Sequence, residues 1–199
     1  VVGPLAGLYV GLVRHAPREA TATALRLHRP SRRELGAIAA TVLMAVALAP
    51  VTQTLDGLLL GALLPEGPSP EALAEVERMK GLILAGSVLA QPVGEELLFR
   101  GFLLPRLAAT AGRGTALLLI SGVYALSQLQ LVPVQAASAL VLGLAFGVAA
   151  LASETAWAAI AGHVAHQAAR LTDYPTAALP VGATIAAAAL VWLARRRPS

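Results

Sequence analysis

The sequence predicts an all-α membrane protein, a bundle of about six or seven transmembrane helices. Two observations lead to this fold class, and a third excludes some kinds of site. Hydrophobic residues make up 57% of the 199 residues, charged residues only 13%, and the mean hydropathy is +0.71. Apolar stretches long enough to cross a bilayer recur along the chain. Cysteine is absent, which excludes disulfides, thiol catalysis and thiolate metal sites.

The apolar stretches are separated by short polar segments. Residues 1–13 are too short for a full span, and we interpret them as the end of a first helix. Ser69 and Pro70 have the character of an N-cap and a first helical position, and they predict a short surface helix. No internal repeat is present, so 1–199 is expected to be a single membrane domain. The complete spans are expected at 35–64, 81–107, 115–131, 134–153, 155–171 and 176–194.

The first of these complete spans is interrupted. It contains Pro50 and a polar group that includes Asp56. Two interpretations stay open: one long tilted helix that continues past the membrane interface, or a span followed by a broken extension. Asp56 is interpreted as an interfacial residue.

Charge is distributed unevenly between the two sides of the predicted bundle. Most of the fifteen basic residues fall in the loop 14–34, at Arg106 and Arg113, and in the tail Arg195–Arg197, while the segment 65–80 is mostly acidic. Basic loops stay in the cytoplasm. We therefore expect a multi-pass protein of a bacterial inner membrane, with 14–34 and the C-terminus cytoplasmic. A nucleic-acid partner is not expected.

Three charged residues, Glu95, Glu96 and Arg100, lie inside the span 81–107. A charge at bilayer depth costs about 2.5–3.5 kcal/mol on insertion scales, so such residues pair or face a cavity. Glu96 and Arg100 have the i,i+4 spacing of a helical ion pair. Glu95 projects to another face without an evident partner, beside a kink expected at Pro92. A carboxylate placed in this way is a candidate general base.

Two later spans carry polar stripes with helical spacing. The first stripe is Ser121, Tyr124 and Gln128. The second is His163, His166, Gln167 and Arg170. At 1.5 Å per residue, Glu95, Gln128 and His163 lie at similar depths, which predicts one shared cavity in the cytoplasmic half. Simple hydrogen bonding between helices is the alternative interpretation of both stripes.

A zinc site is a further possibility that the residue types leave open. Glu95, His163 and His166 could supply three ligands of a catalytic zinc. The His-x-x-His spacing differs from the His-Glu-x-x-His pattern of the common zinc proteases. The candidate site is therefore interpreted either as a glutamate-type site or as a metal-dependent one.

Three motifs resemble those of the CPBP family of intramembrane proteases, which includes CAAX prenyl endopeptidases and bacteriocin-processing (Abi) enzymes. The first motif, Glu-Glu-x-x-x-Arg, is intact at Glu95–Arg100. The second, Phe-x-x-x-His, is matched with Tyr124 and Gln128 in the two key positions. The third, His-x-x-x-Asn or Asp, keeps His163 and has Gln167 in place of the amide or acid.

The resemblance covers about residues 22 to 194, with 35–194 as the family core, and implies an intramembrane endopeptidase. The implied site residues are Glu95, Glu96, Arg100, Gln128, His163 and Gln167. Glu95 would activate a water, the residue at 128 would hold that water, and His163 with the residue four positions later would stabilise the oxyanion. The implied substrate is a peptide, or a prenylated or membrane-inserted protein, in contact with the lipid bilayer.

Gln128 departs from the family pattern, because an amide cannot titrate. His166 is a candidate to supply the missing imidazole. The alternative function is a catalytically weakened family member that serves in binding, bacteriocin immunity or assembly. A third possibility, a small transporter built on the buried carboxylate, lacks the duplicated halves typical of transporters.

Overall fold

The computed structural model describes residues 23, 25–63, 69–129, 135–172, 174–175 and 177–195, with the backbone alone at 72, 73, 76, 80 and 82–85. These residues are helical, without strands, so the predicted all-α class is confirmed. The predicted end of a first helix at 1–13 lies outside the described residues. The helices are α3 (Arg32–Leu63), α4 (Pro70–Ala85), α5 (Gln91–Glu96), α6 (Leu104–Ala111), α7 (Arg113–Leu129), α8 (Ala136–Ser153), α9 (Ala156–Ala169) and α10 (Ala178–Ala194), with π-helices η1 (Gly86–Ala90) and η2 (Leu97–Leu103).

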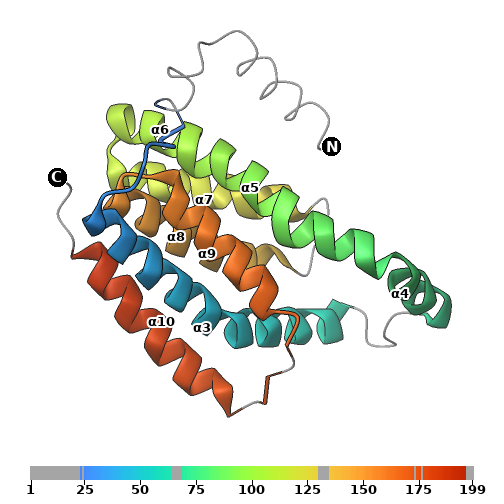
Figure 1. Ribbon diagram of the computed structural model, residues 1–199. Helices are drawn as coiled ribbons and strands as arrows, with labels where there is room; N and C mark the ends of the chain where they lie inside the picture. The colour runs from blue at the N-terminus through green and yellow to red at the C-terminus, as the bar shows by residue number, and fades with distance from the viewer. Residues whose placement is uncertain are drawn as a thin grey trace, which may run out of the picture.

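The described part of each segment predicted as a span from residue 35 onward is mainly helical, and the segment 81–107 runs through α4, η1, α5, η2 and α6. Among the described helices, α3 and α8 are long and apolar enough to cross a membrane by themselves, and α10 is a shorter apolar helix. Helix α3 has 32 residues without interruption. Of the two interpretations of this segment, the single long helix is therefore the correct one. It extends about 48 Å at 1.5 Å per residue, whereas a hydrocarbon core is about 30 Å thick. Pro50 lies inside it, and its axis changes direction along its length (Figure 1).

The segment that carries the two adjacent carboxylates is one long helical run from α4 to α6 (Figure 1). Its start at Pro70 confirms the predicted helix beginning, but the expected separate surface helix is wrong, because α4 continues directly into η1. Pro92 lies in the first turn of α5, between the two π-helices. A proline lacks the N–H that an α-helical interior needs, and a π-helix lies on each side of it. The kink itself stays a prediction.

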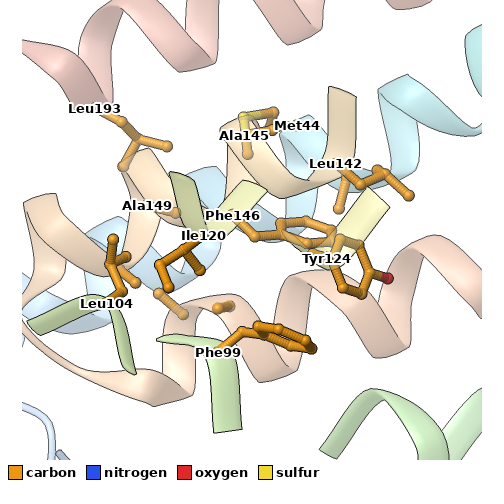
Figure 2. Close-up of a cluster of buried hydrophobic side chains, with 14 of the residues drawn as sticks. Met44, Phe99, Leu104, Ile120, Tyr124, Leu142, Ala145, Phe146, Ala149 and Leu193 are labelled. Atoms are coloured by element: carbon orange, nitrogen blue, oxygen red, sulfur yellow. The ribbon is translucent and has the colours of Figure 1, made fainter. Parts of the chain in front are cut away.

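Small residues bring the helices close together. A Cβ on Gly143 of α8 would lie 3.0 Å from Cβ of Ser121 on α7, and one on Gly162 of α9 would lie 2.7 Å from Thr41 of α3. Such contacts are typical of membrane helices, where van der Waals packing replaces the hydrophobic effect. Figure 2 shows the larger apolar side chains that fill the remaining space, gathered around the buried ring of Phe146.

The two ends of the bundle differ in composition. At one end, the Arg113 end, the backbone N–H of Ala156 donates to the Arg26 carbonyl (3.1 Å), and Arg113 lies 3.7 Å from Glu154. At the other end, the Arg170 end, α3, α7 and α9 finish and α4, α8 and α10 begin. The described parts of the predicted basic segments belong to the Arg113 end, and the described part of the predicted acidic segment belongs to the Arg170 end.

Candidate active site

Glu95 is half-buried on α5 and contacts α7. Its Oε2 accepts a hydrogen bond from the Tyr124 hydroxyl (3.0 Å), and its Oε1 accepts from the side-chain amides of Gln128 (3.1 Å) and Gln91 (2.9 Å). The expectation that this carboxylate has no partner is therefore wrong. A carboxylate offers about four acceptor positions, so three donors leave room for a further hydrogen bond.

Glu96 is fully buried and faces α9 instead. Its Oε1 lies 3.1 Å from Nη1 of Arg100, so the predicted i,i+4 ion pair is confirmed. The same oxygen lies 2.9 Å from Nδ1 of His163, a contact that the sequence does not predict. Adjacent residues on a helix project about 100° apart. The two carboxylates of the motif therefore contact two different helices.

Arg100 is also buried, and it contacts more than its carboxylate. Its guanidinium lies 4.5 Å from the centroid of the Tyr124 ring, within the range of a cation–π interaction, and its Nη2 is 3.4 Å from the Gly143 carbonyl oxygen. Tyr124 thus contacts Glu95 through its hydroxyl and Arg100 through its ring. This tyrosine connects the two charged groups of the helical run.

The contact with Glu96 determines which nitrogen of the His163 ring carries a proton. Because a carboxylate only accepts, Nδ1 of His163 must carry the proton and donate it. Nε2 is then the nitrogen that faces other groups, as an acceptor in the neutral ring and as a donor in the imidazolium. The ring packs edge-on against Tyr124, with centroids 6.4 Å apart, and beside Phe146, at 5.3 Å. Its orientation is therefore set by both polar and apolar neighbours.

His166, one turn further along α9, is held by α3. Its Nε2 lies 2.9 Å from the hydroxyl oxygen of Thr52, and that hydroxyl lies within donating distance of the Leu48 and Ala49 carbonyls. With the hydroxyl proton directed to the backbone, Nε2 of His166 is the donor of the shared bond. The ring is fully buried and bonded to Thr52.

One cavity brings the predicted polar stripes together. Its volume is about 20 Å³, counted as the space open to the centre of a water molecule, which is enough for one water. Glu95 is not part of its wall, but all three of its hydrogen-bond donors are. The lining residues are Gln91, Tyr124, Gln128, Gln135, Ser138, Ala139, Leu142, His163, His166, Gln167 and Arg170.

The position of this cavity bears on the predicted orientation. The lining residues of α7 and α9 belong to the second half of each helix, and those of α8 belong to its first half. The cavity therefore lies toward the Arg170 end of the bundle. The distribution of basic residues predicts that this end is not cytoplasmic, whereas the matched depths predicted a cavity in the cytoplasmic half. These two expectations exclude each other.

A second buried ion pair lies next to the cavity. Asp56 of α3 accepts a hydrogen bond from the Ser138 hydroxyl of α8, and its Oδ2 lies 2.8 Å from Nη2 of Arg170. Asp56 is only 6% exposed and is paired across helices, which the sequence does not predict; its interpretation as a residue at the membrane interface stays a prediction. The sequence feature that could have indicated this ion pair is the polar group after Pro50, which lies toward the same end of the bundle as Arg170.

The described residues do not fit the suggested zinc site. No group of three or more His, Asp or Glu side chains within the described ranges is arranged to hold a metal ion. Glu95 is occupied by amide and hydroxyl donors, Nδ1 of His163 by Glu96, and Nε2 of His166 by Thr52. A catalytic zinc needs three converging protein ligands. Glu95, His163 and His166 do not converge in this way, and no step is assigned to a metal.

A comparison with protein families identifies the central part of the chain. Residues 78–169 match the family model described as type II CAAX prenyl endopeptidase Rce1-like. No curated protein and no solved structure matches the chain. The matched region runs from α4 to the end of α9 and includes all the implied site residues. Residues 78–169 are therefore similar to the Rce1-like CAAX prenyl endopeptidases, which is consistent with the resemblance to the CPBP intramembrane proteases.

Proposed function

We propose that this protein is an intramembrane endopeptidase that cleaves a prenylated or otherwise membrane-inserted peptide with a water activated by Glu95. The observation that carries the proposal is the position of Glu95. Its carboxylate is oriented by Tyr124 and Gln128, two side chains that also line a water-sized cavity containing His163. The family match supports the same class of reaction.

The reaction is proposed to begin with a water at the remaining acceptor position of Glu95. One O–H of this water donates to the carboxylate, and the other can donate to the carbonyl oxygen of the Gln128 amide. Glu95 takes a proton as the water oxygen attacks the peptide carbonyl carbon. The same proton then passes to the leaving nitrogen when the C–N bond breaks, which returns Glu95 to its carboxylate form.

The oxyanion of the tetrahedral intermediate is proposed to lie near His163 and Gln167, which both line the cavity. A protonated His163 donates from Nε2 to the oxyanion while its Nδ1 donates to Glu96. This is the arrangement in which a buried carboxylate orients and stabilises an imidazolium. Glu96 therefore acts on His163 as well as on Arg100.

The second candidate function is binding without hydrolysis, and Gln128 is the observation that favours it. The residue in the place of the family histidine holds Glu95 through an amide, which cannot accept and return a proton. His166 does not replace it in this arrangement, because its ring is fully buried and bonded to Thr52. A family member with this site would bind peptides and cleave them slowly.

Replacing Gln128 with His tests which of the two functions applies. If the geometry is competent, we expect Gln128→His to raise cleavage of a prenyl-cysteine peptide by about 10²-fold or more, the usual contribution of a general acid or base. The measurement is release of the C-terminal fragment by protein in detergent micelles. Gln135→His, on the cavity wall but not bonded to Glu95, is the matched control. A large gain from a near-zero rate favours binding as the natural role.

If the natural chain already cleaves the peptide and Gln128→His changes little, the amide itself holds the water. The proposal fails if neither protein cleaves any peptide of a broad membrane-substrate panel. In that case the binding function stands.

Labelling of single cysteines tests the membrane orientation. The chain has no native cysteine, so Ser69→Cys at the Arg170 end and Ser31→Cys at the Arg113 end can be compared without background. From the positive-inside rule, we expect an impermeant thiol reagent to label Ser69→Cys in intact cells and Ser31→Cys only after lysis. The cavity would then open away from the cytoplasm. The reverse pattern would place its opening in the cytoplasm and overturn the charge-based orientation.

A further inference from the structure

Arg170 is a cation on the cavity wall to which the proposed reaction assigns no role. It caps the C-terminus of α9, and its side chain is 20% exposed. Of the side chains that the described part of the chain contributes to this cavity, Arg170 is the one with a permanent charge. His163, on the same helix face seven positions earlier, is buried. The cavity wall therefore runs from a buried imidazole to a partly exposed guanidinium.

The backbone of Arg170 is fixed by hydrogen bonds, and its partly exposed guanidinium is paired with one carboxylate. Its N–H donates to the His166 carbonyl (3.0 Å), and its carbonyl accepts from the Gln53 amide (2.8 Å). Asp56 Oδ2 lies 2.8 Å from Nη2, an ion pair that engages one nitrogen of the guanidinium from the α3 side. A guanidinium has five N–H donors and binds a carboxylate through two of them at once.

The spacing along α9 indicates what such a cation could bind. Seven residues at 1.5 Å per residue separate His163 from Arg170 by about 10 Å. An extended peptide advances about 3.4 Å per residue, so the same distance corresponds to about three residues. A peptide with its reacting carbonyl at His163 would place the third residue after the cleaved bond at Arg170.

We propose that Arg170 binds the free C-terminal carboxylate of the substrate, about three residues beyond the cleaved bond. The inference rests on the proposed function only in placing a peptide in this cavity. Asp56 orients the guanidinium from the α3 side and balances its charge when the cavity is empty. The C-terminus of a helix disfavours an anion, so the attraction has to come from this side chain rather than from the backbone of α9.

The experiment compares two peptides that differ only at the C-terminus. Both carry a prenylated cysteine followed by three apolar residues, one with a free carboxylate and one with a carboxamide. Binding is measured to the Glu95→Gln protein in detergent micelles, so that cleavage does not interfere. We expect the acid to bind about 10-fold or more tightly than the amide, the size of one charge-assisted hydrogen bond. In Glu95→Gln/Arg170→Gln this preference should disappear.

Two further variants separate binding from folding. Arg113→Gln, at the other end of the bundle, should keep the preference for the acid. Asp56→Asn combined with Arg170→Gln removes both charges, so no buried carboxylate is stranded, and it should lose the preference with a near-normal melting temperature. Equal binding of acid and amide to the Glu95→Gln protein, binding of neither, or a preference that survives Arg170→Gln would overturn the inference. A preserved preference without any cleavage by the natural chain would reject the proposed function and keep this one.

Discussion

Replacing Glu95 with Gln is expected to lower peptide cleavage by at least about 10²–10⁴-fold, the contribution of a positioned general base. Gln has the same shape but cannot take a proton from water. The fold should tolerate the change, because the Tyr124 hydroxyl can rotate to accept and the amides of Gln91 and Gln128 can turn over. The measurement is single-turnover cleavage together with the melting temperature of the purified protein.

Glu71→Gln provides the matched control for this change, since Glu71 lies in the exposed first turn of α4, outside the cavity. It should leave both rate and melting temperature unaltered. Undiminished cleavage by Glu95→Gln would remove Glu95 from its role as the base.

The largest effect on stability is expected from breaking the Glu96–Arg100 pair. Arg100→Gln leaves Glu96 buried with His163 as its remaining hydrogen-bond partner among the described residues. Removing one partner of a buried pair costs about 3–5 kcal/mol. The melting temperature should fall by roughly 10 °C for a chain of this size. Thermal unfolding in detergent, followed by circular dichroism or a thermal-shift dye, measures the loss.

The double change Glu96→Gln with Arg100→Gln should recover part of this loss, because it leaves no unpaired buried charge. A full cycle of both single variants and the double variant isolates the interaction. Arg106→Gln, on the exposed part of α6, is the control for loss of an arginine outside the core. Simple addition of the two single effects would show that the pair does not contribute.

Local patterns predicted the helices and the pair within one helix, but not the pairs between helices. The spans follow from apolar length, and Glu96–Arg100 follows from i,i+4 spacing, because both depend only on the geometry of a single helix. The contacts of His163 with Glu96 and of Thr52 with His166 depend on how two helices are rotated about their own axes. That rotation is set by small-residue packing, such as Gly162 against Thr41.

The missing partner of Glu95 illustrates the same limit. Tyr124 and Gln128 were placed on one polar face of their helix by periodicity, and their depth was matched to that of Glu95. Depth alone does not determine which side chain points at which neighbour. The Glu95 carboxylate was therefore expected to lack a partner, although Tyr124 and Gln128, which donate to it, had both been placed on a polar stripe at the same depth. The pairing of Asp56 with Arg170 is likewise beyond the sequence, because it depends on how α3 and α9 lie beside each other.

The π-helices η1 and η2 on either side of α5 have a consequence for the way this segment can change over time. A π turn holds about one residue more than an α turn, so each one takes up an extra residue within a single turn. If the same residues of Gly86–Ala90 rewound as a regular α-helix, everything after them would rotate by about 100°, and Glu95 and Glu96 would turn away from α7 and α9 together. Loss of one residue from that stretch would let the turn close as an α turn and keep the phase, whereas rewinding at constant length would not. The chemistry of this segment therefore depends on its π turns as strictly as on its side chains.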